Sequence, residues 1–173
     1  MILTVTPNPA LDLTYRIDRA DIGDTNRVPP ALVRAGGKGV NVARALRQAG
    51  FDAEAVTTAG GATGAEFRAD LAESGIPAVL VEAPGATRRS TALVETATGR
   101  TTVLNERGVP LPQQQVDELL EAVSSRLVDA RCVVVSGSLP PGVAPDLPAR
   151  VVELARARDI PCVVDATGDA LFA

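Results

Sequence analysis

The residues best suited to chemistry in this sequence stand in a glycine-rich stretch around one lysine. Residues 36–46 read Gly-Gly-Lys-Gly-Val-Asn-Val-Ala-Arg-Ala-Leu, and apolar residues recur at helical spacing from Val42 to Ala49. Backbone N–H groups at the start of such a helix attract anions, and Lys38 adds a full positive charge. Asn41, in the first turn, can offer its amide to a hydroxyl group. The stretch therefore predicts a pocket for a small phosphorylated or hydroxylated ligand.

A tight turn before a helix would give the same glycine pattern without any ligand. Two familiar phosphate-binding motifs do not decide between these interpretations. The pattern G-x-x-x-x-G-K-[ST] fails because Gly39 follows Lys38, and G-x-G-x-x-G fails because Val42 stands at its last position. The choice therefore depends on other residues that converge on the same place.

The absence of histidine excludes several classes of site within this chain. Ser–His and Cys–His nucleophile systems and His-ligated metal sites all need an imidazole. The net charge of −4 argues against binding to nucleic acid or to a membrane surface. The first residues lack the basic segment of a signal peptide, and no apolar run is long enough to span a membrane. We therefore expect a cytoplasmic protein that binds a small molecule. Cys132 and Cys162 stand in apolar runs, and we expect both to be reduced and buried.

Strand-like apolar runs alternate with helical patterns along most of the chain. This alternation predicts a parallel sheet covered by helices on both faces. Two β-branched runs around Gly99 predict a hairpin in a separate small β element, which we interpret as a lid. Thr63 and Glu66 form a capping-box pattern that predicts the start of a helix. The expected helices cover residues 38–49, 63–74, 116–127 and 147–155, and the expected strands cover residues 2–6, 15–18, 27–34, 53–58, 77–82, 90–95, 101–104, 132–135 and 161–164.

Polar residues follow several of the predicted strands. In parallel sheets of this kind, ligands bind beyond the carboxyl ends of the strands. This rule places Asp12, Gly60, Gly61, Ser136–Ser138 and Asp165 along one rim of the sheet, facing the glycine-rich helix start. Each of these alone would usually be only a turn residue. Their agreement on one rim favours a ligand site there.

Four segments of the sequence are similar to motifs of the ribokinase-like sugar kinases, in the phosphofructokinase-B branch. Residues 6–12 resemble T-x-N-P-A-x-D, residues 36–43 resemble G-G-K-G-x-N-V-A, and residues 136–142 resemble S-G-S-L-P-P-G. Residues 163–168 resemble a later V-D-x-S-G stretch. Within the branch, the sequence is most similar to the 1-phosphofructokinases and then to the tagatose-6-phosphate kinases and minor-type 6-phosphofructokinases.

The resemblance implies a fold and a set of binding residues. The fold would be a three-layer α/β sandwich with a mostly parallel sheet and a small β lid, truncated at its C-terminal side. Residues 1–173 would form the amino-terminal, substrate-binding part of one kinase domain, with the lid strands within residues 13–35 and 77–106. A solvated charge in a loop is the alternative interpretation of Arg88. The implied roles are sugar-hydroxyl binding by Asp12 and Asn41, pocket lining by Gly37, and binding of the phosphate already on the sugar by Lys38, Arg88 and Ser138.

Two motifs depart from the family pattern, and both lie in the expected lid. Ser90 replaces the asparagine of T-R-x-N, and Arg107 replaces the proline of N-E-P-G. These departures leave the identity of the sugar open.

Complete family members are nearly twice as long as this chain. Their second half carries the N-x-x-E segment tied to Mg²⁺, most of the ATP pocket, and G-A-G-D with the catalytic aspartate. The resemblance therefore implies that ATP and Mg²⁺ are the cofactors and that the catalytic aspartate lies beyond Ala173. Asp169 follows a glycine, but it fits the V-D-x-S-G stretch better than G-A-G-D. We expect this chain alone to be inactive and prone to self-association through an uncovered edge strand.

The function implied by the resemblance is phosphorylation of a ketohexose phosphate by ATP. The first candidate reaction converts fructose 1-phosphate into fructose 1,6-bisphosphate, with this chain as the amino-terminal half of the kinase. The alternatives are a tagatose-6-phosphate kinase or 6-phosphofructokinase relative, or a non-catalytic fragment that binds a phosphosugar.

Overall fold

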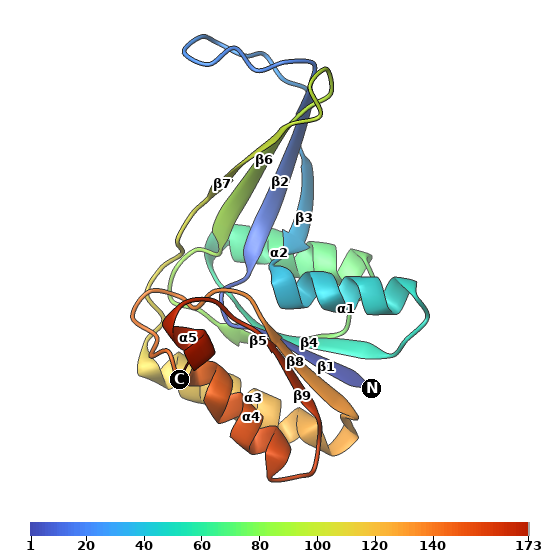
Figure 1. Ribbon diagram of the computed structural model, residues 1–173, viewed down its shortest axis with the longest axis vertical. Helices are drawn as coiled ribbons and strands as arrows, with labels where there is room; N and C mark the ends of the chain where they lie inside the picture. The colour runs from blue at the N-terminus through green and yellow to red at the C-terminus, as the bar shows by residue number, and fades with distance from the viewer. Residues whose placement is uncertain (173) are drawn as a thin grey trace.

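The computed structural model describes residues 1–172, which form two β-sheets and the helices that pack on them (Figure 1). Sheet A consists of five parallel strands in the order β5-β4-β1-β8-β9. The central strand β1 pairs with β4 on one side and with β8 on the other. The strands of sheet A are β1 (Ile2–Thr6), β4 (Ala53–Ala59), β5 (Ala78–Glu82), β8 (Cys132–Ser136) and β9 (Cys162–Asp165).

Helices cover both faces of sheet A, as expected for parallel strands joined by crossovers (Figure 1). One face carries α1 (Lys38–Gln48) and α2 (Gly61–Glu73), with Val40 and Phe67 among the fully buried side chains. The opposite face carries α3 (Gln113–Arg126), the short 3₁₀ helix Leu127–Asp129 and α4 (Leu147–Arg156). The predicted α/β sandwich with a mostly parallel sheet is confirmed. A four-residue helix, α5 (Asp169–Phe172), follows β9.

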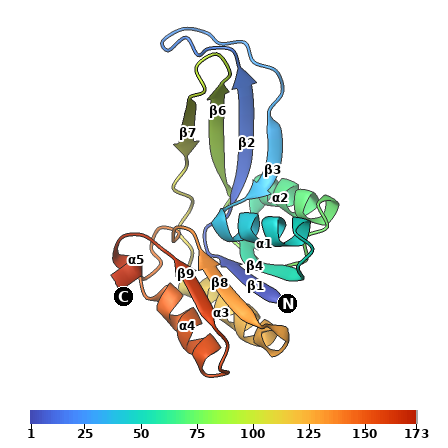
Figure 2. The same cartoon turned by 45° about the vertical axis from the view of Figure 1, so that its right-hand side comes forward.

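Sheet B projects away from the sandwich as a four-stranded arm (Figure 2). Its order is β3-β2-β6-β7, in which β2 and β6 are parallel and the outer pairs are antiparallel. The strands are β2 (Ala10–Ile17), β3 (Leu32–Gly36), β6 (Arg88–Glu95) and β7 (Thr101–Asn105). The ranges expected for the lid strands differ from sheet B in three ways: β2 begins at Ala10, β3 ends at Gly36, and β5 belongs to sheet A.

The predicted capping box at the start of α2 was wrong. Helix α2 begins at Gly61 with Gly60 as its N-cap residue, so Thr63 does not cap it. The Thr63 hydroxyl instead donates a hydrogen bond to the Thr87 carbonyl at 2.6 Å, which ties the helix to the segment leading into β6.

Cys132 and Cys162 are free thiols, as predicted, but both are half-buried rather than buried. For Cys162 the cause is that β9 is an edge strand of sheet A among the described residues, with Val163 of the same strand 55% exposed. Cys132 is the first residue of β8. An apolar run therefore indicated the strand correctly but not its place in the sheet. No helix among residues 1–172 combines the length and the apolar character needed to cross a membrane.

Candidate functional site

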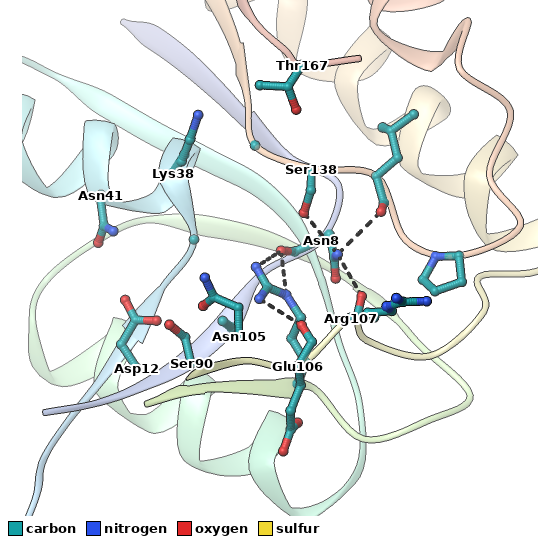
Figure 3. Close-up of a pocket in the computed structure, with 16 residues that line it drawn as sticks. Asn8, Asp12, Lys38, Asn41, Ser90, Asn105, Glu106, Arg107, Ser138 and Thr167 are labelled. Carbon is teal, nitrogen blue, oxygen red and sulfur yellow. Dashed lines mark hydrogen bonds between the residues drawn. The ribbon is translucent and has the colours of Figure 1, made fainter. Parts of the chain in front are cut away.

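A polar cavity of about 830 Å³ lies between the carboxyl ends of the strands of sheet A and the base of sheet B (Figure 3). Its walls come from β2 and β6, the end of β7, the start of α1, and the segments that follow β1, β7, β8 and β9. The structure brings together all six residues proposed from the sequence as binding residues. They are Asp12, Gly37, Lys38, Asn41, Arg88 and Ser138.

The glycines before α1 allow the cavity wall to pack closely. A Cβ on Gly36 would lie 1.9 Å from an Asp12 carboxylate oxygen, so only glycine leaves that carboxylate in place. Gly37 has a φ of 99°, which side chains of L-residues disfavour, and its missing Cβ would lie 2.9 Å from the Thr6 side chain. Gly37 is therefore needed for the conformation that connects β3 to α1, whereas Gly36 is needed to leave the Asp12 carboxylate in its position.

Asp12 lies within β2, rather than in the turn before it, and its side chain faces the cavity. It stands opposite Ser90 of β6 in the parallel pair, while Asn41 approaches from α1. Burial raises the pKa of Asp12 above its usual value, although Arg88 and hydrogen bonding from Asn41 favour the carboxylate form. A partly desolvated carboxylate beside an amide and a hydroxyl is suited to binding sugar hydroxyl groups.

Lys38 is the first residue of α1, and its ammonium group is paired with Asp165 at the end of β9. The Nζ atom lies 3.0 Å and 3.3 Å from the two carboxylate oxygens of Asp165. The Ser136 hydroxyl also donates to this carboxylate, at 2.8 Å. Hydrogen bonds from Lys38 and Ser136 hold the pKa of Asp165 below its usual value. The ion pair joins the two sides of the cavity across 127 residues of sequence.

Arg88 is the first residue of β6, and its guanidinium group is half-buried and bound to backbone carbonyls. Its Nε and Nη2 donate to the Asn8 carbonyl at 3.3 and 3.1 Å, and its Nη1 donates to the Glu106 carbonyl at 3.1 Å. Burial lowers the pKa of Arg88, opposed by the charges of Asp12 and Glu106. The alternative of a solvated loop charge is therefore wrong for Arg88.

Asn8 connects the walls of the cavity and was not proposed as a site residue. Its Nδ2 donates to the Ser138 hydroxyl oxygen and to the Arg107 carbonyl, both at 3.1 Å, and to the Leu139 carbonyl at 3.4 Å. The side chain is 8% exposed. Because it stands in the motif of residues 6–12, the sequence contained a signal for it.

The sequence reasoning assigned no role to several other residues of the lining. Ser90 of β6 and Asn105 of β7 face one another in the antiparallel register, which no local pattern reveals. Three further lining residues follow strands β7 and β9, and they are Glu106, Arg107 and Thr167. Asp169 does not line this cavity but borders a smaller neighbouring hollow next to Ser138.

Residues 1–172 contain no group of three or more His, Cys, Asp or Glu side chains arranged to hold a metal ion. The carboxylates nearest the cavity do not form such a group: Asp12 lies in the cavity wall, whereas Asp165 is paired with Lys38. We therefore assign no Mg²⁺ ligand to this chain.

Comparison with known proteins supports the resemblance seen in the motifs. The profile of the pfkB family of carbohydrate kinases matches residues 6–173. The chain belongs to this family. A curated pfkB-type relative, ATP-dependent 6-phosphofructokinase isozyme 2 of Mycobacterium tuberculosis, is 34% identical over 170 residues. That match covers 98% of this chain and 50% of the relative.

Solved structures show the same pfkB fold. A possible 1-phosphofructokinase from Thermotoga maritima is 31% identical, with a TM-score of 0.93 over 99% of this chain and 55% of that one. Phosphofructokinase-2 from Escherichia coli in complex with fructose-6-phosphate is 32% identical, with a TM-score of 0.89 over 98% of this chain and 56% of that one. The same E. coli enzyme is also known in a tetrameric inhibited form. The chain therefore spans about half the length of the relatives it matches.

Proposed function

We propose that this chain binds a ketohexose phosphate for phosphorylation by ATP, as the substrate-binding part of a pfkB-family kinase. The observation that carries the proposal is that one cavity is lined by two chemically different sets of side chains. Asp12 and Asn41 are suited to hydroxyl groups, whereas Lys38, Arg88 and Ser138 are suited to an anion. A ligand that matches both sets carries hydroxyl groups and a phosphate on the same small molecule.

Each proposed contact follows from the chemistry of the side chain. The Asp12 carboxylate accepts hydrogen bonds from sugar hydroxyls, and the Asn41 amide can donate or accept. A phosphate dianion is suited to a lysine, an arginine and a hydroxyl donor, because charge-assisted hydrogen bonds are stronger than neutral ones. Held by its hydroxyl groups and by its phosphate, the sugar would present one further hydroxyl group in a fixed orientation. Fixing the acceptor in this way is the main contribution that such a binding site makes to phosphoryl transfer.

ATP supplies the phosphoryl group in this reaction, and Mg²⁺ neutralises the charge that develops on it. We assign neither the metal ligands nor the general base to residues 1–172. Asp12 is committed to the sugar in this proposal, and Asp169 lies outside the cavity. The catalytic aspartate is therefore proposed to lie outside the described residues.

Fructose 1-phosphate is our first candidate substrate, with fructose 1,6-bisphosphate as the product. The similarity to the possible 1-phosphofructokinase from T. maritima supports it. Fructose 6-phosphate is the second candidate. It is supported by the similarity to the 6-phosphofructokinase isozyme 2 of M. tuberculosis and to the E. coli phosphofructokinase-2 in complex with fructose-6-phosphate. Both sugars carry one phosphate and several hydroxyl groups, so the residues that line the cavity are compatible with either.

Calorimetric titration of the protein with fructose 1-phosphate, fructose 6-phosphate and fructose tests the proposal. We expect Lys38→Ala or Arg88→Ala to weaken binding of the phosphosugar by about 2–4 kcal/mol. Asp12→Ala should weaken binding of the phosphorylated and the unphosphorylated sugar alike. Unchanged affinity in the Lys38 and Arg88 variants would refute the phosphate assignment, and tighter binding of fructose 6-phosphate would select the second candidate. Sugar-dependent ADP release by the gene product that contains this chain tests the kinase activity itself.

We also propose that this chain on its own self-associates through sheet A. Strand β9 lies at the edge of that sheet among the described residues, and its side chain Val163 is 55% exposed. An apolar edge strand with unpaired backbone groups tends to pair with another chain. Light scattering would show a mass above 17.8 kDa, whereas a strictly monomeric mass at all concentrations would contradict the proposal.

A further inference from the structure

Three residues that line the cavity carry a positive charge, and two of them are already engaged. The ammonium group of Lys38 is paired with Asp165. The guanidinium group of Arg88 donates through three nitrogens to the carbonyls of Asn8 and Glu106. The third is Arg107, whose guanidinium group forms no hydrogen bond or ion pair with any of residues 1–172. Arg107 therefore keeps all five of its N–H donors free.

The backbone of Arg107 is held in place beside the proposed phosphate site. Its carbonyl accepts a hydrogen bond from Asn8 Nδ2, and the same nitrogen donates to the Ser138 hydroxyl oxygen. The next residue, Gly108, has a φ of 89°, and a Cβ there would lie 2.8 Å from the Asn8 amide oxygen. The side chain of Arg107 therefore starts from a fixed point near Ser138, while its exposed end remains free to turn toward a ligand.

The charges around this end of the cavity favour an anion. Arg88 and Arg107 both line it, and the carboxylates that act on Arg88 are Asp12 and Glu106. The Glu106 carboxylate points away to accept from the backbone N–H of Arg89, at 2.7 Å (Figure 3). The Asp12 carboxylate acts directly on Arg88 and offsets part of its charge, whereas no carboxylate is paired with Arg107 among residues 1–172. A guanidinium fork matches a phosphate with two parallel hydrogen bonds, which gives geometric selection as well as charge.

We propose that Arg107 binds the phosphate group of the sugar substrate, together with Arg88 and Ser138. This inference rests on the proposed function, because it assumes that a sugar phosphate occupies the cavity. A free ketohexose has no anionic group for Arg107 to bind. Arg107 is therefore a specificity residue that favours phosphorylated over unphosphorylated sugars. The family motif places a proline at this position, and proline has no side-chain donor that could make this contact.

The test is calorimetric titration of the protein with fructose 1-phosphate, fructose 6-phosphate and fructose. We expect Arg107→Ala to weaken binding of the preferred phosphosugar by about 10- to 100-fold, the effect of losing charge-assisted hydrogen bonds, and to leave fructose binding unchanged. Arg107→Lys keeps the positive charge but lacks the planar guanidinium group. Its affinity for the phosphosugar should lie between those of the unmodified protein and of Arg107→Ala. Arg89→Ala is the matched control, because Arg89 is the exposed arginine next to Arg88 and does not line the cavity.

The outcomes separate this inference from the function on which it rests. If the unmodified protein binds no fructose phosphate, the proposed function fails. If it binds one and Arg107→Ala binds that ligand equally well, only the role of Arg107 is refuted. A loss as large in Arg89→Ala as in Arg107→Ala would also refute it, because net charge alone would then explain the effect. Circular dichroism of each variant excludes misfolding as the cause of a loss.

Discussion

The carboxylate of Asp165 holds the ammonium group of Lys38, with Nζ 3.0 Å from one oxygen and 3.3 Å from the other. The pair joins the start of α1 to the end of β9, and both side chains are about half exposed. Lys38 is thus partly neutralised by the protein itself. A ligand phosphate that binds Lys38 must compete with Asp165 for the same group.

Asp165→Asn should therefore tighten phosphosugar binding, because it removes the competing charge. The gain should be less than about tenfold, since exposed ion pairs contribute little. The lowered pKa keeps Asp165 ionised throughout the neutral range, so the gain should not vary between pH 6 and pH 8, beyond the titration of the ligand phosphate itself (pKa about 6). Calorimetric titration measures it, with Asp169→Asn as the control for an equal change in net charge. Weaker binding in Asp165→Asn would show that the carboxylate orients Lys38 instead of competing for it.

Asp12→Asn should stabilise the ligand-free protein while weakening sugar binding. Burial raises the pKa of Asp12, so the folded state holds this proton more tightly than the unfolded state does. The stabilisation of the folded state by protonated Asp12 is therefore present below the pKa that Asp12 has in the unfolded chain. It is lost as the pH rises through the pKa that Asp12 has in the folded protein. At pH 7 the charged carboxylate therefore costs stability, and its removal should raise the melting temperature by no more than about 3 °C.

Thermal unfolding of Asp12→Asn and of the unmodified protein, measured at pH 7 and at successively lower pH, tests the sign of this effect. The difference should shrink as Asp12 becomes protonated in the unmodified protein. A variant that is less stable at neutral pH would show that the hydrogen bonds of the carboxylate outweigh its burial.

Gly36→Ala should impair sugar binding without touching a ligand. The new Cβ would lie 1.9 Å from Asp12 Oδ2, so the carboxylate must leave its position. We expect the affinity for fructose to fall as far as it does in Asp12→Ala. The double variant Gly36→Ala with Asp12→Ala supplies the control, because the clash vanishes when the carboxylate is absent. If the two losses add independently in the double variant, the glycine acts by another route.

Cys162 should react slowly with thiol reagents at neutral pH. Burial raises its pKa from 9.0 to about 11, with the charge of Cys132 as the second cause. At pH 8 its thiolate fraction is then about 100-fold smaller than that of a thiol with the ordinary value, and only the thiolate reacts. The rate of disulfide exchange in a Cys132→Ser variant should rise about tenfold per pH unit up to pH 10. A rate that levels off near pH 9 would contradict the raised pKa.

The sequence predicted the layers of the fold well because periodicity reports burial. Apolar runs indicated strands β1 and β8, and the stripe along residues 116–127 indicated α3. Periodicity does not report sheet membership, so the run at residues 77–82 was grouped with the lid although β5 pairs with β4. The same limit hid the edge position of β9, and with it the partial exposure of Cys162.

The candidate site was predicted unevenly, according to whether its residues stand in compact motifs. Lys38 and Asn41 stand in one glycine-rich segment, so their types and spacing indicated a ligand. Arg107 and Asn105 come to the cavity only because β7 pairs with β6 in a particular register. Asn8 shows the intermediate case, since the motif contained it but only the structure shows its three acceptors.

The central position of β1 has a consequence for synthesis of the chain on the ribosome. Its partner β8 lies about 130 residues later in the sequence, and the Asn8–Ser138 contact spans 130 residues. Contacts between such distant segments form late, because closing a long loop costs entropy before the contact stabilises it. One edge of β1 therefore stays unpaired until β8 has been synthesised, and the cavity cannot assemble until the loop after β8 has left the ribosome. A chaperone that shields apolar strands would protect the nascent chain during that interval.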